Sequence, residues 1–250
     1  MSETLAAVRA EFTKLRGVRS TFLALLLFVP LSIAVAALGG WSAKNAIDSD
    51  NPGLRSDFTP EQAGLDGILY GQLALIVFGV LIVAGEYTSG MMRVSLLAVP
   101  RRGRLYAAKT AVTAVAALAV AVPVTLASYL VTQSALGPHG ASIGTDGVPR
   151  ALAGAIVYLT LMSLFAAGVA ATARSAVLPL AVLLPMVLAG SQILSVIGAT
   201  KDVVRYFPDR AGTQLLTVGS HDATTGFLVL LAWTAAALAA GYLRHRRWDT

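Results

Sequence analysis

The sequence has no cysteine, so it offers neither a disulfide framework nor a thiolate ligand for a metal or redox site. Charged residues are also scarce, at 13%, whereas 56% of the residues are hydrophobic and the mean hydropathy is +0.72. A typical soluble domain carries about 25% charged residues. The scarcity of charge therefore excludes an ordinary soluble domain and indicates a membrane protein.

Several catalytic and energy-coupling patterns are also missing. The sequence contains no HExxH motif and no cluster of His, Asp and Glu with metal-ligand spacing. The dipeptide Gly-Lys, which a Walker A phosphate-binding loop requires, does not occur. Of the three histidines, His139 and His221 are expected on the outer side of the membrane and His245 in the C-terminal tail, which argues against a proton relay within the membrane. We expect no catalytic residue, metal or cofactor on this chain.

Long stretches without Asp, Glu, Lys or Arg predict the fold class. Each is long enough to cross the hydrocarbon core of a bilayer, which takes about 20 residues of helix. They predict an all-α membrane protein in which residues 1–250 form a single transmembrane domain, with a loop of little structure at 41–66. The outer segment 198–222 is too apolar for a solvated loop, so we expect it to dip into the outer leaflet or to lie on it as short helices. Pro179 and Pro185 predict a bent or broken fifth span. The six predicted spans are about 20–40, 67–84, 110–133, 151–172, 177–197 and 223–243.

The lysines and arginines divide unevenly between the two sides of the membrane. If the N-terminus is cytoplasmic, 13 of the 19 cations lie on the cytoplasmic side, against only four of the 13 carboxylates. The positive-inside rule therefore predicts that both termini are cytoplasmic. The cations are spread over four short segments that flank the spans, so we interpret the pI near 9.9 as a sign of topology and expect no nucleic-acid partner.

The segment before the first span has an amphipathic pattern. Apolar residues recur at helical spacing between Leu5 and Leu15, and basic residues occupy the other faces. This pattern predicts a helix that lies in the plane of the lipid headgroups, with a solvated basic leader as the alternative. The residues that we assign to this interfacial helix are Phe12, Lys14, Leu15, Arg16 and Arg19.

The polar segment between the second and third spans is rich in cations. Tyr87, Met91, Val94 and Ala98 are four, three and four residues apart, so they predict a short amphipathic helix with one apolar face. A proline two residues later ends that helix. A span is connected to each end of this helix, so a protein outside the membrane that binds the helix would be able to move the spans. The alternative is a surface helix that only ends the second span.

Uncharged polar side chains within the spans are candidates for lining a solute path. Tyr70 and Gln72 lie in the second predicted span, and Ser191 and Gln192 lie in the fifth. The two glutamines are the strongest candidates, because a primary amide that faces lipid is unfavourable. Hydrogen bonds between helices, worth about 1 kcal/mol or less each, are the alternative interpretation.

The polar segment resembles the segment after the second span in bacterial ABC-2 type permeases, the membrane subunits of ATP-binding-cassette transporters. The likeness rests on EYTSGMMR from Glu86, followed by LLAVPRR and then Lys109. Met91 departs from the threonine that is usual in the family after Gly90. The leader EFTKLRGVRST from Glu11 is similar to the family's elbow helix, and Tyr206-Phe207-Pro208 before the sixth span also fits.

The resemblance implies a dimer of six-span chains, identical or different, in a bacterial plasma membrane, with two cytosolic ATPase subunits that bind ATP and Mg²⁺. Residues 86–98 would form a coupling helix that docks into a cleft on each ATPase, whose closure would move spans two and five and open a central path. The residues assigned to ATPase coupling are Glu86, Tyr87, Thr88, Ser89, Gly90, Met91, Arg93, Val94, Leu97, Pro100, Arg101 and Arg102.

An export permease powered by a separate ATPase is thus the leading hypothesis. One alternative is a membrane interaction or sensing subunit that transports nothing, and another is a carrier that works without an ATPase. Drugs, peptides, lipids and ions are all compatible with the sequence as cargo.

Overall fold

The computed structural model describes residues 3–49, 57–91, 102–197 and 200–246. Within these ranges the chain is helical and has no strand. The elements are α1 (Glu3–Gly17), α2 (Arg19–Asp48), α3 (Pro60–Asp66), α4 (Ile68–Thr88), α6 (Arg102–Leu136), the short 3₁₀ helix η1 (Gly137–His139), α7 (Val148–Ala173), α8 (Val177–Pro185), the π-helical turn η2 (Met186–Gly190), α9 (Ser191–Val196), α10 (Lys201–Val204), α11 (Pro208–Thr213) and α12 (Ala223–Arg246).

Six stretches of helix in the described ranges are long and apolar enough to cross a membrane, which confirms the predicted fold class. They are α2, α3 with α4, α6 with η1, α7, α8 to α9, and α12. Several helices run past the predicted bounds, since α2 continues to Asp48 and α6 begins at Arg102. A charge-free window marks only the part that needs an apolar surface, whereas helical hydrogen bonding continues into the polar zone on either side.

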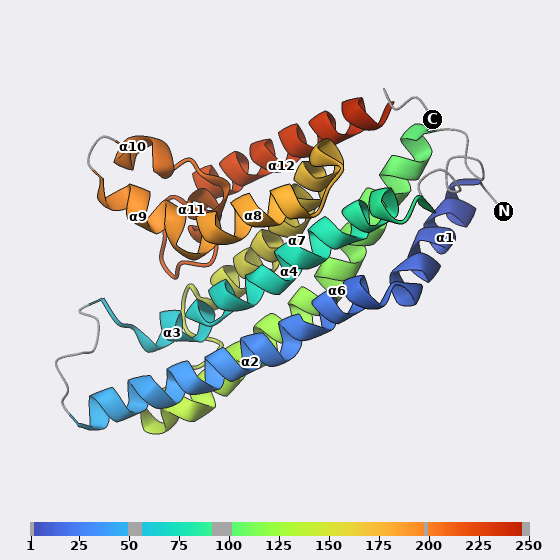
Figure 1. The fold of residues 1–250 in the computed structure, drawn as a ribbon. Coiled ribbons are helices and arrows are strands. Elements are labelled where there is room, and N and C mark those ends of the chain that lie inside the picture. The colour runs from blue at the N-terminus through green and yellow to red at the C-terminus, as the bar shows by residue number, and fades with distance from the viewer. Residues whose placement is uncertain (1–2, 50–56, 92–101, 198–199, 247–250) are drawn as a thin grey trace.

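The long helices run alongside one another with α4 and α7 at the centre (Figure 1). α7 packs against α4, α6 and α12, and α2 packs against α4 and α6. The most apolar window of α3 with α4 is 67% buried, against 22% for both the fifth span and α12, so the last two spans present most of their surface outward. Gly79 permits a close approach of α4 to α7, because a Cβ there would lie 2.2 Å from the carbonyl oxygen of Ser163.

The fifth span is interrupted, as its prolines predict. Pro185 ends α8, and the π-helical turn Met186–Gly190 follows. Regular α-helix then continues as α9. A proline has no N–H to donate, so regular hydrogen bonding breaks at this position. By contrast, Pro30 and Pro123 lie inside the continuous helices α2 and α6.

The two predictions for the outer segments had different outcomes. Short helices, one of the two forms expected for 198–222, occur in the described part as α10 and α11, and α11 packs against α7 and α12. The expectation of little structure at 41–66 was wrong, because α3 occupies Pro60–Asp66 and α2 reaches Asp48. The start of α3 is capped by Thr59, whose hydroxyl accepts from the backbone N–H of Gln62 at 3.3 Å. A Thr-Pro helix start is a local pattern that the count of apolar windows does not detect.

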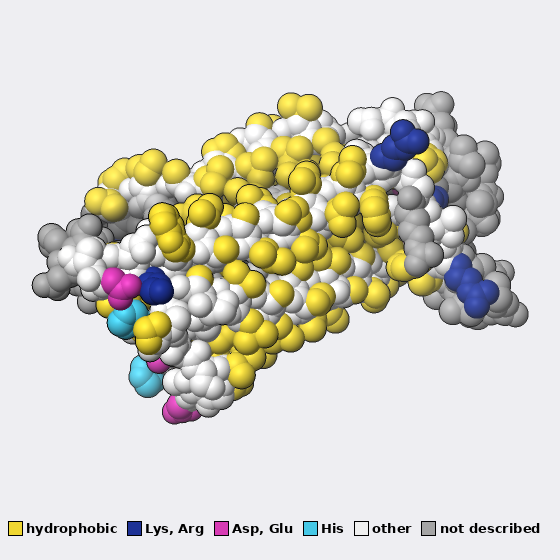
Figure 2. Space-filling model, turned by 90° about the horizontal axis from the view of Figure 1, so that it is seen from below, with side chains coloured by type: hydrophobic (Ala, Val, Ile, Leu, Met, Phe, Trp, Pro, Cys, Tyr) yellow, Lys and Arg dark blue, Asp and Glu magenta, His cyan; other side chains and the backbone are white. Residues whose placement is uncertain are grey.

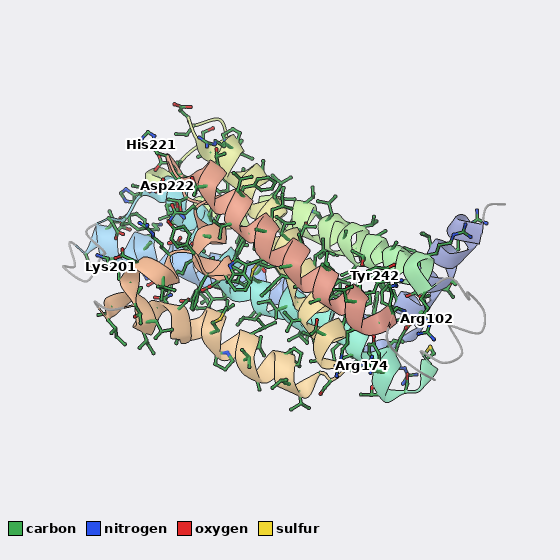
Figure 3. All side chains as sticks on the ribbon, turned by 90° about the horizontal axis from the view of Figure 1, so that it is seen from above. Arg102, Arg174, Lys201, His221, Asp222 and Tyr242 are labelled. Carbon is green, nitrogen blue, oxygen red and sulfur yellow. The ribbon has the colours of Figure 1, made fainter. Side chains whose placement is uncertain are left out.

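Charge is segregated between the two ends of the bundle. Figure 2 shows an apolar belt over the visible face, with lysines and arginines mainly at one end and carboxylates and histidines mainly at the other, where a Lys or Arg side chain also lies. Arg102 and Arg174 lie at one end, whereas Lys201, His221 and Asp222 lie at the other (Figure 3). The N- and C-terminal ends of the chain lie at the end of the bundle that holds Arg102 and Arg174. Below, this is called the cation-rich end.

Candidate functional site

The second span ends in a defined turn. Glu86, Tyr87 and Thr88 form the last turn of α4, and the backbone N–H of Ser89 donates to the carbonyl of Gly85 at 3.1 Å. Gly90 follows with φ +72°, a left-handed conformation that favours glycine and ends a helix. The sequence pattern predicted one helix through Glu86 and Met91, and this part of the prediction was wrong. Apolar spacing at 87 and 91 matches a helix even when a turn lies between the two residues.

The rest of the predicted coupling helix lies outside the described residues. This applies to Arg93, Val94, Leu97, Pro100 and Arg101. The described chain resumes at Arg102, the first residue of α6.

Four charged side chains meet next to the end of α4. Lys109 Nζ lies 2.6 Å from Glu11 Oε2 and 2.9 Å from Glu86 Oε1. Lys14 Nζ lies 2.6 Å from Glu11 Oε1 and 2.9 Å from Glu86 Oε1. Two carboxylates and two ammonium groups therefore form one network, which we call the ion cluster. It joins α1, α4 and α6.

The ion cluster is mostly buried. Glu11, Glu86 and Lys109 are only 4%, 6% and 4% exposed. Charges in such a setting are tolerated when they are paired and hydrogen-bonded, and the equal numbers of the two signs satisfy this condition. Burial alone would lower the pKa of Lys14, but its hydrogen bonds to the carboxylates of Glu11 and Glu86 outweigh burial and raise the pKa of this ammonium. At neutral pH Lys14 therefore stays charged.

The ion cluster explains how the interfacial helix sits on the bundle. Leu15 is 6% exposed beside the buried Glu11, whereas Phe12 is 39% exposed and Arg19 is also exposed. The face of α1 that packs on the bundle therefore combines an apolar side chain with a charged pair. The side chain of Arg16 lies outside the described residues. Sequence reasoning missed Glu11 and Lys109, although Glu11 stands within a basic leader and Lys109 is the last charge before the third span.

A second set of contacts fixes the end of α12 at the same end of the molecule. The Tyr87 hydroxyl lies 3.4 Å from His245 Nδ1, and His245 is 1% exposed. Arg102 donates to the carbonyl of Arg246 at 2.9 Å, and Arg174 donates to that of Arg244 at 2.7 Å. Guanidinium groups at the carboxyl end of a helix satisfy its last carbonyls and complement its dipole. The last turn of α12 is thus attached to α4, to α6 and to the residue that follows α7.

The four candidate path residues divide into two buried and two exposed side chains. Gln72 is 4% exposed, accepts a hydrogen bond from the Tyr158 hydroxyl and donates to the carbonyl of Leu69 at 2.7 Å. Ser191 is 1% exposed. In contrast, Tyr70 is 56% exposed and Gln192 is also exposed. The structure therefore does not bring the four together, and the two buried ones are used in hydrogen bonds between or within helices.

Asp209 on α11 is a buried acid to which the sequence analysis gave no role. It is 4% exposed and accepts a hydrogen bond from the Ser191 hydroxyl of α9, while its Oδ1 has no hydrogen-bond partner among the residues that the structure describes. Burial raises the pKa of this carboxyl, and the hydrogen bond from Ser191 offsets only part of that effect. The pair ties α11 to the fifth span.

These observations define a class of protein. Six apolar helices, a charge-free belt and segregated charged ends describe a multi-pass membrane protein. Among the described residues no three His, Asp or Glu side chains are grouped so that they could hold a metal ion.

Comparison with known proteins places the chain in a family. A family model described as "ABC-2 family transporter protein" matches residues 7–198, so the chain belongs to the ABC-2 transporter family. It is a membrane permease of an ABC transporter. The matched region includes α1, the ion cluster and the first five spans, and it ends before α10, α11 and α12. A search of curated proteins found no match.

Proposed function

We propose that this chain forms the export path of an ABC transporter and receives the movement of a separate cytosolic ATPase at the cation-rich end of α4. The observation that carries the proposal is the ion cluster, which joins the last turn of α4 to α1 and α6 through Glu86. The segment that begins at Glu86 is also the part of the sequence that resembles the family's coupling region. An exposed segment seated in a groove of a partner is a recurrent mode of recognition.

The ion cluster provides a physical route for that movement. Displacing α4 alone would separate Glu86 from Lys14 and Lys109 and leave buried charges unpaired, which costs several kcal/mol. Moving α1, α4 and α6 together keeps every pair intact. A force applied at Ser89 to Met91 would therefore shift the interfacial helix and two spans as one body.

The exposed polar side chains support a second permease chain. Tyr70 and Gln192 face outward on a single chain, and a primary amide in contact with lipid would be unfavourable. Contact with a second chain, identical or different, or with a water-filled path between two chains, removes that penalty. The assembly would hold two copies of the ATPase, with ATP and Mg²⁺ bound there and no cofactor on this chain.

The distribution of charge supports the orientation. The termini lie at the cation-rich end, which the positive-inside rule places in the cytoplasm of a bacterial cell. The ATPase would meet the permease at that surface. A membrane sensor that transports nothing and a carrier without an ATPase are the alternatives that the following experiment distinguishes.

The absence of cysteine makes a direct test possible, because a single introduced cysteine is the only thiol on the chain. Ser89→Cys places it on an exposed residue at the end of α4, and His221→Cys places it on an exposed residue at the opposite end. Each variant is produced together with its ATPase in inside-out membrane vesicles and treated with a short thiol-to-amine cross-linker. We expect ATPase cross-linked to Ser89→Cys and not to His221→Cys. Efficient labelling of Ser89→Cys without any cross-linked ATPase would favour one of the two alternatives.

A further inference from the structure

A pocket of about 350 Å³ lies at the cation-rich end of the bundle, between the C-terminal ends of α7 and α12. Its volume is within the range of pockets that hold small ligands, roughly 300–1,000 Å³. Two of the five described residues that line it carry guanidinium groups, and none of the five is acidic. The pocket therefore presents positive charge to a ligand. The lining residues are Thr172, Arg174, Ala240, Leu243 and Arg244.

The two arginines are held at the pocket in different ways. Arg174 follows the last residue of α7 with φ +56°, a left-handed conformation that is strained for a residue with a side chain. Its Nη2 donates to the carbonyl of Arg244 at 2.7 Å, which fixes its guanidinium against the last turn of α12. The side chain of Arg244 is exposed and makes no hydrogen bond or ion pair with the part of the chain that the structure describes. One guanidinium is thus fixed in place, and the other is able to turn toward a ligand.

The pocket lies where the apolar belt meets the cation-rich end. The fourth and sixth predicted spans end at residues 172 and 243, and both of these residues line the pocket. Leu243 is 53% exposed, and Val177, three residues after Arg174, is 77% exposed. These apolar side chains meet lipid, whereas the arginines lie at the level of the headgroups. A ligand that fits both parts has an anionic group at one end and apolar chains at the other.

We propose that this pocket binds the headgroup of an anionic phospholipid from the adjacent leaflet, with the phosphate between the guanidinium groups of Arg174 and Arg244. Basic pockets between transmembrane helices bind acidic lipid headgroups, and a guanidinium matches two phosphate oxygens with two parallel N–H groups. A zwitterionic lipid also has a phosphate, but its ammonium meets two cations and no carboxylate among the described lining residues. The site therefore favours phosphatidylglycerol over phosphatidylethanolamine.

Two pairs of matched substitutions separate this pocket from its surroundings. Arg244 and Arg246 are both exposed in the last turn of α12, but only Arg244 lines the pocket. Arg244→Gln and Arg246→Gln therefore remove the same charge from the same end of the molecule. Ala240 and Ala239 are both exposed on α12, and only Ala240 lines the pocket. Ala240→Trp fills the pocket, whereas Ala239→Trp adds the same side chain outside it.

The test is native mass spectrometry of the full chain in detergent, titrated with lipids of identical acyl chains. The headgroups are glycerol and ethanolamine, and free glycerol phosphate is titrated separately. We expect phosphatidylglycerol to bind about tenfold more tightly than phosphatidylethanolamine, because each arginine near a membrane surface favours an anionic lipid several-fold. Arg244→Gln and Ala240→Trp should remove most of this preference. Arg246→Gln and Ala239→Trp should keep it.

The wild-type chain alone can overturn the proposal, so the test does not depend on the folding of any variant. Equal binding of the two lipids would contradict it. Free glycerol phosphate that binds as tightly as phosphatidylglycerol would show a soluble anion instead. Equal losses in Arg244→Gln and Arg246→Gln would show attraction to the overall charge of this end, and a preference that survives in Ala240→Trp would place the lipid elsewhere. Equal lipid binding together with loss of the ATPase from Arg244→Gln would assign the pocket to the ATPase.

Discussion

Lys109 on α6 and Glu11 on α1 form an ion pair of 2.6 Å between positions 98 residues apart in the sequence. Both residues are 4% exposed, and the same ammonium also contacts Glu86 at the end of α4. The interfacial helix is thereby attached to the two spans that border the family's coupling region. At the cation-rich end of the permease, α1, α4 and α6 are therefore linked to one another through ion pairs.

The two lysines of the ion cluster should contribute unequally to stability. The Lys109 side chain is 6% exposed and that of Lys14 is 25% exposed. Lys109→Met leaves buried carboxylates without their main partner, which costs about 3–5 kcal/mol. Lys14→Met should cost clearly less, because water can approach its position. Thermal unfolding of both variants in one detergent measures the difference, and equal melting temperatures would show that the ion cluster is more hydrated than its burial indicates.

Two glycines in α4 should respond in opposite ways to the same substitution. A Cβ at Gly79 would lie 2.2 Å from the carbonyl oxygen of Ser163, whereas a Cβ at Gly85 meets nothing within 4 Å. Gly79→Ala should therefore destabilise the packing of α4 on α7 by roughly 1–3 kcal/mol. Gly85→Ala should be neutral or stabilising by up to about 1 kcal/mol, because alanine favours the helix. Unfolding of Gly79→Ala at the wild-type temperature would contradict the close contact between these helices.

Asp209 should make stability depend on pH. Burial raises the pKa of its carboxyl in the folded chain above the ordinary value of 3.8, so the folded state binds the proton more tightly than the unfolded state. Stability from this group is therefore full at pH below 3.8 and is lost as the pH rises through the folded pKa. Asp209→Asn should melt at a higher temperature than wild type near neutral pH, and the difference should shrink as the pH falls toward 3.8. A constant difference across that range would show that burial does not raise this pKa.

Glu86 should be needed for communication with the ATPase. Glu86→Gln removes the charge that both ammonium groups bind, and we expect the permease-stimulated ATP hydrolysis of the reconstituted complex to fall about tenfold, equivalent to about 1.4 kcal/mol. Glu61→Gln, the same change on α3 near the opposite end, is the matched control and should leave hydrolysis unchanged. Arg93→Ala tests the adjacent segment in the same assay. If ATP hydrolysis is stimulated normally in both Glu86→Gln and Arg93→Ala, the proposed role of this segment in communication with the ATPase is contradicted.

The six spans could be predicted from the sequence because the requirement depends only on the residues within each span. A helix that crosses a bilayer needs about 20 residues without charge, and such stretches can be found directly in the sequence. The same local reasoning predicted from Pro179 and Pro185 that the fifth span is bent or broken, and the interruption follows Pro185. The predicted ends of the helices were less accurate, because helical hydrogen bonding continues beyond the apolar part. The first span, for example, was predicted to end near residue 40, whereas α2 continues to Asp48.

The ion cluster could not be predicted because it depends on tertiary packing. Nothing in the spacing of Glu11 and Lys109 shows that α1 folds back against α6. The turn at Gly90 was missed since glycine is tolerated within helices, and only its φ of +72° distinguishes a terminus from an interior position. The burial of Asp209 was not predicted because an isolated acid outside the spans is usually exposed, whereas packing of α11 on α7 and α12 buries it.

The proposal that an ATPase acts on the end of α4 is tested most directly by a density map of the purified permease bound to its ATPase. We expect the chain from Gly85 to Met91 to lie against a cleft of each ATPase subunit, with Glu86 still bound to Lys109. A complex in which the ATPase contacts other parts of the permease, or in which this end of α4 lies on the extracytoplasmic surface, would contradict the proposal.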